Sequence, residues 1–278
     1  MCGTKRLYRL RYAVGVTNIR LSTIVICLLG LSASGWGQVA APGEAGVSMG
    51  HVHFYSKDTD AHKKFWVEIM GAQDLPVEGF SVFKMPGAII VVSKGDRAGG
   101  TEGSVVNHIA VKVKDLAATL GKLEAAHITI VSRNPPQAMV LGPDDVRVEL
   151  TEDTALAQPL AFHHLHFYTP NVDEMKKWYV ATFGAIPGKR GRFEAADLPG
   201  VNLTFAPGTG TLAVTKGRVL DHIGFEVRGL EAFTKKLEAG GTKFDITYRQ
   251  VPALGIAIAF LTDPWGTYIE LTEGLDKL

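Results

Sequence analysis

The hydrophobic and polar positions along the chain follow one order four times. In each unit a strand-like alternation comes first, a segment with helical periodicity follows, and short β-rich runs come last. The pattern predicts opening strands at residues 50–56, 105–113, 164–169 and 219–227. It predicts helices at residues 59–70, 116–126, 172–183 and 230–239. It predicts closing strands at residues 81–85, 88–93, 146–151, 193–196, 201–205, 257–261 and 267–272. The chain is therefore predicted to consist of four strand–helix–strand modules.

Helix caps and breaks support these boundaries. Asp58 and Asp115 stand where a side chain can cap the first turn of a helix, and Gly71 stands where a helix can end. The Gly- and Asp-rich residues 94–103 are predicted to be a linker, and residues 154–160 show no periodicity. We therefore predict two domains of two modules each, at residues 48–153 and 161–275.

The modules are repeats of one another. His51-Val52-His53-Phe54-Tyr55 recurs as His164-Leu165-His166-Phe167-Tyr168, and at this offset of 113 (164 minus 51) ten of 22 positions are identical. The second and fourth modules match at an offset of 114 (222 minus 108), which aligns His108-Ile109 with His222-Ile223. The chain is thus a pair of similar halves, each with two unlike modules.

Histidines and glutamates inside predicted strands are the candidates for chemistry. His51 and His53 share one face of a strand because residues i and i+2 point the same way, and the same holds for His164 and His166. A single histidine on a half-buried strand is more often a hydrogen-bonded core residue than a ligand. Glu270, between Ile269 and Leu271, is harder to explain in this way, because a buried carboxylate is costly unless it is paired or metal-bound. Glu149 has the same setting, although Arg147 on the same face offers it a salt bridge.

Together these features resemble the vicinal oxygen chelate superfamily, which includes glyoxalase I, extradiol dioxygenases, fosfomycin-resistance enzymes and bleomycin-binding proteins. The resemblance rests on His51 and His164 a fixed distance before Gly71 and Gly184, on the strand starts at His108 and His222, and on the Asp-Pro-x-Gly turn at 263–266 before Glu270. It implies an α+β fold in which four βαβββ modules pair into two tandem cup-shaped mixed sheets, with helices on the outside.

The resemblance also implies where metal ligands lie. Carried over residue by residue, it assigns His164, His222 and Glu270 to a site in the C-terminal half. It assigns His51, His108 and Glu149 to a site in the N-terminal half. Two neutral imidazoles and one carboxylate suit a divalent cation such as Fe, Mn, Zn or Ni and leave positions open for substrate oxygens. His166 and His53, next to these ligands, are candidates for moving a proton, or have a structural role.

Departures from the named relatives leave the reaction open. Glyoxalase I takes a second glutamate from strands that here, at residues 88–92 and 201–205, contain no carboxylate. The tyrosine of extradiol dioxygenases is replaced by Phe260, and residues 251–254 contain no histidine. Dioxygenase-like chemistry on a small substrate with vicinal oxygens is the best single hypothesis, because a three-ligand site suits it. A metal-free binding protein of the bleomycin-resistance type is the alternative.

The N-terminus and the charge restrict location and partners. Residues 1–37 contain five basic residues, no acidic ones and an apolar run at 21–33, which predicts a signal peptide and a periplasmic or secreted protein. An uncleaved anchor is the alternative. Both cysteines lie in this segment, so a cysteine nucleophile is excluded from the mature chain. Without the segment, 24 basic residues (29 minus 5) face 28 acidic ones, a net charge of −4 that argues against nucleic acid or anionic membrane as a partner. A small molecule is therefore the expected partner, and the oligomeric state is open.

Overall fold

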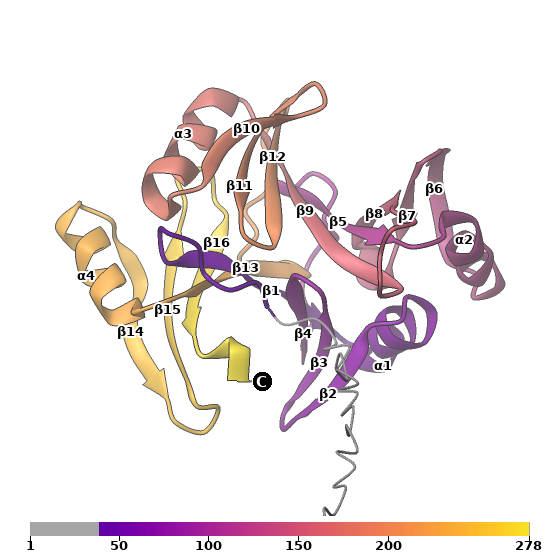
Figure 1. The fold of residues 1–278 in the computed structure, drawn as a ribbon, viewed down its shortest axis with the longest axis horizontal. Coiled ribbons are helices and arrows are strands. Elements are labelled where there is room, and N and C mark those ends of the chain that lie inside the picture. Colours follow the sequence, from indigo (N-terminus) through magenta and orange to yellow (C-terminus); the bar gives the residue numbers. More distant parts are fainter. Residues whose placement is uncertain (1–38, 278) are drawn as a thin grey trace, which may run out of the picture. The chain divides into compact units, whose positions relative to one another are not determined.

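The computed structural model describes residues 39–277, which form two mixed sheets of eight strands each (Figure 1). The predicted signal peptide lies outside the described residues. Each of the four modules has one strand, one helix and three further strands, as predicted. The α+β fold of four βαβββ modules in two cup-like sheets is therefore confirmed.

The element bounds show how closely the modules repeat. The first module contains β1 (Val47–Ser56), α1 (Thr59–Lys63) with its π-helical continuation η1 (Lys64–Ile69), β2 (Gln73–Val77), β3 (Phe80–Met85) and β4 (Ala88–Lys94). The second contains β5 (Val106–Val113), α2 (Leu116–Ala125), β6 (Thr129–Asn134), β7 (Gln137–Leu141), the 3-10 turn η2 (Pro143–Asp145) and β8 (Arg147–Glu152). The third contains β9 (Leu160–Thr169), α3 (Val172–Phe183), β10 (Ile186–Arg190), β11 (Phe193–Leu198) and β12 (Val201–Pro207). The fourth contains β13 (Leu220–Val227), α4 (Leu230–Ala239), β14 (Phe244–Val251), β15 (Ile256–Thr262), β16 (Tyr268–Glu273) and η3 (Leu275–Lys277).

The predicted caps are present where the helices begin and end. The side chains of Asp58 and Asp115 accept hydrogen bonds from the backbone N–H groups of Ala61 and Ala118, at 3.0 and 2.8 Å. Gly71, which lies beyond the first helical segment as predicted, and Gly184, which ends α3, have φ values of 87° and 68°, a left-handed conformation that glycine adopts without strain. Local sequence therefore determines the helix ends.

The modules pair across the two halves of the chain. The strand order of the first sheet is β14-β15-β16-β13-β1-β4-β3-β2, so it joins the first module to the fourth. The second sheet, β10-β11-β12-β9-β5-β8-β7-β6, joins the third module to the second. The prediction that residues 48–153 and 161–275 each form one sheet is therefore wrong. All four opening strands carry the same alternation, so the local pattern does not select the partner.

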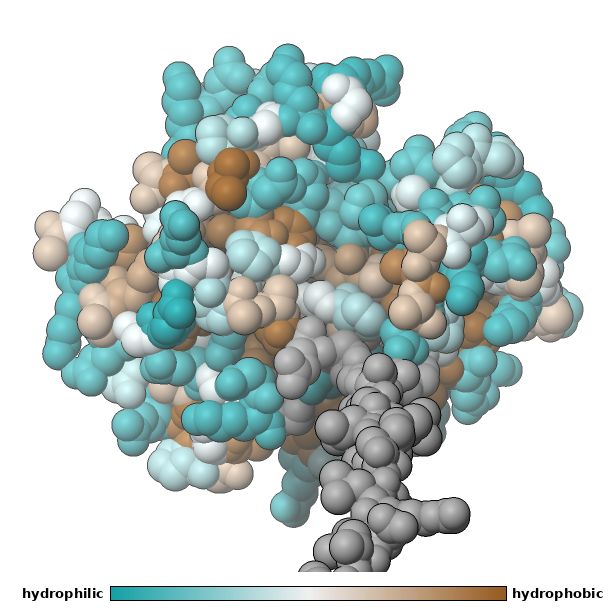
Figure 2. Space-filling model, viewed as in Figure 1, coloured by the Kyte–Doolittle hydropathy of each residue, from teal (hydrophilic) through white to brown (hydrophobic). Residues whose placement is uncertain are grey.

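The buried core is continuous through both sheets and the helices that cover them. Strand alternation sends Val52 and Phe54 into this core while His51 and His53 face the other side of β1. The helices lie on the outside of the sheets (Figure 1). Hydrophilic side chains predominate on the visible surface, with small apolar areas between them (Figure 2). No helix among residues 39–277 is long and apolar enough to cross a membrane.

Candidate metal centre

The first candidate site, defined as His51, His53, His222 and Glu270, is assembled by the pairing of β1 with β13. These strands are antiparallel, with His51 opposite Gly224 and His53 opposite His222. On its other side β13 runs parallel to β16, which places Gly224 opposite Glu270. Glu270, Gly224 and His51 thus form one row across three strands. Because Gly224 has no side chain, those of Glu270 and His51 meet above it.

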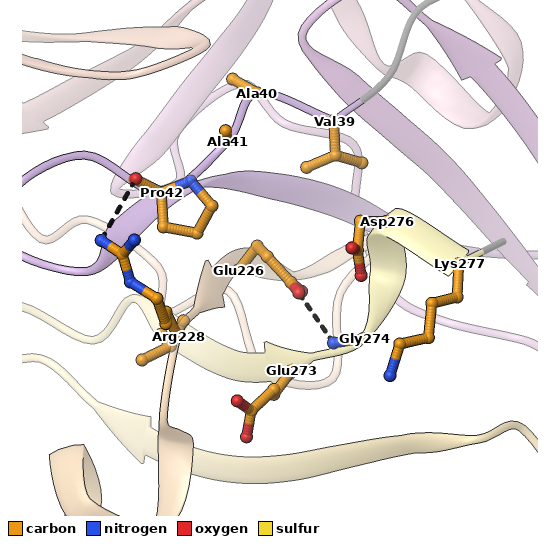
Figure 3. Close-up of a pocket in the computed structure, with 11 residues that line it drawn as sticks. Val39, Ala40, Ala41, Pro42, Glu226, Arg228, Glu273, Gly274, Asp276 and Lys277 are labelled. Atoms are coloured by element: carbon orange, nitrogen blue, oxygen red, sulfur yellow. Dashed lines mark hydrogen bonds between the residues drawn. The ribbon is translucent and has the colours of Figure 1, made fainter.

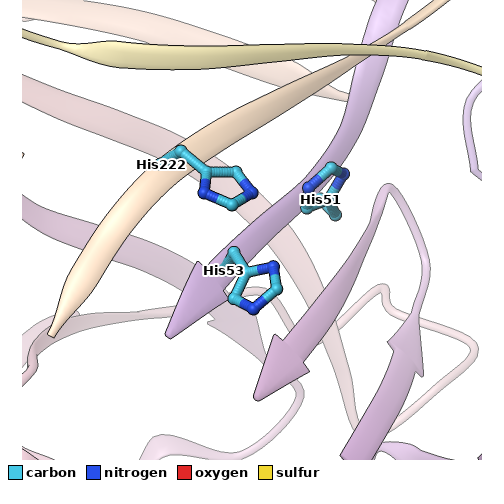
Figure 4. A group of neighbouring side chains, drawn as sticks. All are labelled: His51, His53 and His222. Atoms are coloured by element: carbon cyan, nitrogen blue, oxygen red, sulfur yellow. The ribbon is translucent and has the colours of Figure 1, made fainter. Parts of the chain in front are cut away.

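The side chains of the first site converge on one carboxylate oxygen. The Nε2 atoms of His51 and His222 lie 3.0 and 2.9 Å from Oε2 of Glu270. All three side chains are buried. The ring nitrogens of His51, His53 and His222 also lie within 4.8 Å of one another (Figure 4). This close approach joins residues that are 219 positions apart in the sequence.

The hydrogen bonds of His222 require a positive charge in this cluster. Its Nδ1 lies 2.9 Å from Oδ1 of Asp221, and because a carboxylate only accepts, Nδ1–H donates there. The lone pair of Nε2 then faces the Glu270 carboxylate, which is repulsive unless a proton or a metal ion lies between them. With a proton in that place, burial lowers the pKa of His222, but hydrogen bonds to Asp221 and Glu270 outweigh it and raise the pKa. Burial likewise raises the pKa of Glu270, while hydrogen bonds from His222 and His51 bring it well below its usual range.

The ligand atoms fit a divalent cation. Two ligands at 90° around an ion with bonds of about 2.1 Å are about 3 Å apart. The separations of 3.0 and 2.9 Å from Glu270 to the two imidazoles match this spacing. The Asp221 carboxylate behind His222 is the outer partner that orients a metal-bound histidine.

His53 shares this cluster of ring nitrogens with His51 and His222, but its hydrogen bond is to Ser93 and not to Glu270. Its Nε2 lies 2.8 Å from the hydroxyl of Ser93, and its ring is 4.6 Å from that of His222. Burial, followed by the proximity of His222 and His51, lowers its pKa to about 2. His53 is therefore a neutral imidazole at physiological pH, with a ring nitrogen that can accept a hydrogen bond.

A small apolar cavity opens onto the first site. It has a volume of about 120 Å³, and His51, His53 and Glu270 form part of its wall. The remaining lining is apolar except for Thr272 and comprises Val77, Phe80, Val82, Ile89, Val91, Leu254, Ile256 and Leu275. No lysine or arginine lines it, so the cavity suits an uncharged, apolar group.

The second candidate site, defined as His108, His164, His166 and Glu149, occupies the equivalent place in the other sheet. The ring nitrogens of its histidines also lie within 4.8 Å of one another. Glu149 is farther from its partners, at 3.5 Å from Nε2 of His108 and 4.0 Å from Nε2 of His164. Arg190 fills the space between them, since its Nη2 lies 2.8 Å from Nε2 of His164. Burial, and then Arg190, keep the pKa of His164 well below its usual range.

The structure regroups the predicted ligands. All six lie in one of the two clusters, but His51 pairs with His222 and Glu270, and His164 pairs with His108 and Glu149. The predicted division into an N-terminal and a C-terminal triad is wrong, because each site takes one strand from each half. The candidate base next to His222 is accordingly His53 and not His166, which lies beside His108 at 4.4 Å between ring centroids.

Two contributions were missed from the sequence. Arg190, a residue with no predicted role, lies against His164, and Arg147 pairs with Glu102 instead of Glu149. Gly224 was passed over, although a Cβ there would lie 2.1 Å from Cε1 of His51. Comparing the repeats position by position could have identified both, since the offset of 113 aligns Arg190 with Val77 and that of 114 aligns Gly224 with Ala110.

A larger cavity of about 400 Å³ lies elsewhere, against the first described residues (Figure 3). It is lined by residues 39–42 together with charged side chains that include Arg228 and Glu273. The Glu226 carboxylate beside it accepts a hydrogen bond from the backbone N–H of Gly274 at 2.7 Å. None of the candidate histidines lines this cavity, so the first site has the stronger claim to chemistry.

Comparison with known proteins places the fold. Residues 161–271 match the family described as the Glyoxalase/Bleomycin resistance protein/Dioxygenase superfamily. Glyoxalase I from Zea mays is 16% identical with a TM-score of 0.64, over 83% of this chain and 94% of that one. A variant of that enzyme is 15% identical with a TM-score of 0.66, over 84% of this chain and 95% of that one. A candidate dioxygenase from Bacillus subtilis is 14% identical with a TM-score of 0.64, over 85% of this chain and 86% of that one. No curated protein sequence matches the chain. At these identities the similarity to solved structures establishes the fold.

Proposed function

We propose that this chain, whose residues 161–271 match the glyoxalase/bleomycin resistance protein/dioxygenase superfamily, is a metal-dependent enzyme of that superfamily that acts on a small substrate through two adjacent oxygens. The observation that carries the proposal is the approach of His51 and His222 to one oxygen of Glu270, at 3.0 and 2.9 Å, beside an apolar cavity. The reaction we favour is dioxygenase-like.

Two imidazoles and a carboxylate on one side of a cation form the ligand set typical of non-haem iron oxygenases. His51, His222 and Glu270 would hold the ion. A divalent cation bound there would act as a Lewis acid toward substrate oxygens and would lower the pKa of a coordinated hydroxyl. The proposed cofactor is therefore Fe, Mn, Zn or Ni in the divalent state, with iron the choice for oxygen chemistry.

His53 supplies proton transfer in this proposal. Burial lowers its pKa to about 2, so His53 is a neutral imidazole whose ring nitrogen can accept a hydrogen bond from a substrate hydroxyl. A divalent ion that lowered the pKa of that hydroxyl would allow its proton to pass to this weak base. The Ser93 hydroxyl, 2.8 Å from Nε2, orients the ring. His51 and His222 are less suited to this step, because the Glu270 carboxylate already engages both.

The cavity wall points to the class of substrate. Its apolar lining has no cationic side chain, so a carboxylate or phosphate on the substrate would be buried without a partner. We therefore expect a compact catechol- or enediol-like molecule whose non-chelating part is apolar. The proposed location is the periplasm or the cell exterior, which rests on the predicted signal peptide alone.

Metal analysis of the purified full-length protein tests the proposal first. We expect one divalent ion per chain, lost in Glu270→Gln, because the carboxylate is then neutral. Glu68→Gln is the matched control, since Glu68 is exposed and belongs to neither candidate site. Retention of the ion by the Glu270 variant would refute the assignment of the site. Absence of any ion after supplementation would favour the metal-free binding protein.

Oxygen uptake tests the reaction. The iron-loaded protein is offered a panel of catechols with apolar or charged substituents, and we expect uptake only with apolar ones. His53→Gln should lower kcat more than KM while the metal content stays constant, because His53 contacts the substrate and not the ion. His127→Asn is the control, since His127 is exposed and belongs to neither candidate site. Equal rates for the His53 variant and the unmodified protein would remove the proton-transfer role.

A further inference from the structure

The two candidate sites stand on the same backbone frame but have different linings. The offset of 113 aligns β2, Gln73–Val77, with β10, Ile186–Arg190, residue for residue. Val77 in the wall of the first site therefore corresponds to Arg190 in the second. The first site therefore has an apolar side chain at a position where the second site has a cationic one.

Arg190 engages the groups that would bind a metal ion. Its Nη2 donates to Nε2 of His164 at 2.8 Å and lies 3.7 Å from Oε1 of Glu149. Its Nε donates to the hydroxyl of Thr204 at 2.9 Å, which fixes the guanidinium in this place. A guanidinium carries only donors and keeps its charge in proteins, so the His164 lone pair is already used.

Glu149 is also satisfied by the protein itself. Nε2 of Gln137 donates to Oε1 of Glu149 at 2.9 Å. Gln137 pairs with Thr151 on β8, as Ile258 pairs with Thr272 on β16, so the first site has an apolar residue in that place. Glu270 correspondingly has the two histidines as its side-chain partners, whereas Glu149 has an amide and a guanidinium as well.

The two sites also differ at the residue that lies between the glutamate and the histidine on the middle of three neighbouring strands. Ala110 lies between Glu149 and His164 in the second sheet, where Gly224 lies between Glu270 and His51 in the first. At Gly224 a Cβ would come within 2.2 Å of Nδ1 of His51, so the ring can lie there only above glycine. In the second site Nδ1 of His164 lies 3.3 Å from Nδ1 of His163, whereas the residue before His51 is Gly50.

We propose that the second site does not bind a metal ion, that the Arg190 guanidinium supplies the positive charge there, and that the chain binds its metal ion at the first site alone. The part that concerns the first site rests on the proposed function. A fixed cation 2.8 Å from one ligand atom and 3.7 Å from another would weaken binding of a divalent ion by roughly a hundredfold or more. Arg190 thus takes the place of the metal ion in the second sheet.

Exchange of the linings tests this assignment. The variant Arg190→Val, Gln137→Ile and Ala110→Gly gives the second site the residues of the first. We expect its metal content, measured by elemental analysis and by titration with Mn²⁺, to exceed that of the unmodified protein by one ion per chain. Adding Glu149→Gln should remove that ion. Arg190→Lys, which keeps the charge, should not gain it.

Single variants of the natural protein complete the test. Glu149→Gln should leave the metal content unchanged, whereas Glu270→Gln should abolish it. Two ions in the unmodified protein, one of them lost in Glu149→Gln, would overturn the inference and leave the proposed function standing. No ion in the unmodified protein but one in the exchanged variant would refute the proposed function and support the role of Arg190. An exchanged variant that is folded by circular dichroism and gains no ion would overturn the inference.

Discussion

Gly224→Ala is the most direct probe of how the fold builds the first site. The added Cβ would lie 2.1 Å from Cε1 and 2.2 Å from Nδ1 of His51, well inside van der Waals contact. The backbone of β13 cannot retreat, because β1 and β16 pair with it on both sides. The imidazole of His51 must therefore move away from Glu270.

The cost can be worked from this contact. Inserting a methyl group into a packed site costs about 1–3 kcal/mol. In the metal-free protein His51 can rotate and relieve most of that strain, so the free energy of unfolding should change little. To bind the ion, His51 must move back toward Glu270 and against the added Cβ, so the strain energy is subtracted from the free energy of metal binding. Metal affinity should therefore fall by about five- to 150-fold, the equivalent of about 1–3 kcal/mol.

The assay compares two quantities in the same variant. Isothermal titration with Mn²⁺ measures metal affinity, and urea denaturation of the metal-free protein measures the free energy of unfolding. Gly121→Ala is the control, because Gly121 lies in α2 with no heavy atom within 4 Å of the added Cβ. The control should keep its metal affinity and gain up to about 1 kcal/mol of stability from helix propensity. Unchanged metal affinity in Gly224→Ala would refute the argument that glycine is needed beneath His51.

Three further predictions concern the scaffold. Tyr179→Phe removes the hydroxyl that donates to buried Asp263 at 2.9 Å, and urea denaturation should show a loss of about 1–3 kcal/mol; an unchanged midpoint would contradict this role. Leu123→Ala empties a fully buried position in α2 and should cost about 2–5 kcal/mol in the same assay, whereas a cost near zero would mean that the helix does not pack as described. The hydrogen bond from His62, at 3.0 Å, holds the pKa of Asp144 below its ordinary value of 3.8. A depressed folded pKa stabilises the protein above the unfolded pKa, and this contribution is lost as the pH falls through the folded value. Asp144→Asn should therefore lower the thermal midpoint at pH 6 and show a smaller acid dependence, and parallel pH profiles would rule out this linkage.

Part of the site follows from local sequence because strand alternation and repeats are local properties. The two-residue spacing of His51 and His53 places both on one face of β1, and the apolar neighbours of Glu270 bury its carboxylate. The caps at Asp58 and Asp115 follow from the same kind of short-range rule. These regularities were sufficient for the four modules and for the six residues of the two clusters.

Pairing between modules could not be obtained in that way. β1 and β9 share the run His-x-His-Phe-Tyr and the same alternation, so the hydrophobic pattern alone accommodates either neighbour for each. The approach of His51 to Glu270 spans 219 positions and depends on the register of three strands. An error in that pairing exchanged the partners of His51 and His164, although all six residues do lie in one of the two clusters.

The sequence by itself determined the module count, the helix ends and the residue types capable of chemistry, because each depends on neighbours a few positions away. Only the tertiary structure decided which histidine meets which carboxylate. It also decided that Arg190 occupies the second site. Its guanidinium contacts His164 because β10 lies at the edge of the second sheet. The physical reason is that hydrophobic periodicity specifies the face on which a side chain lies, whereas long-range strand pairing specifies what stands opposite it.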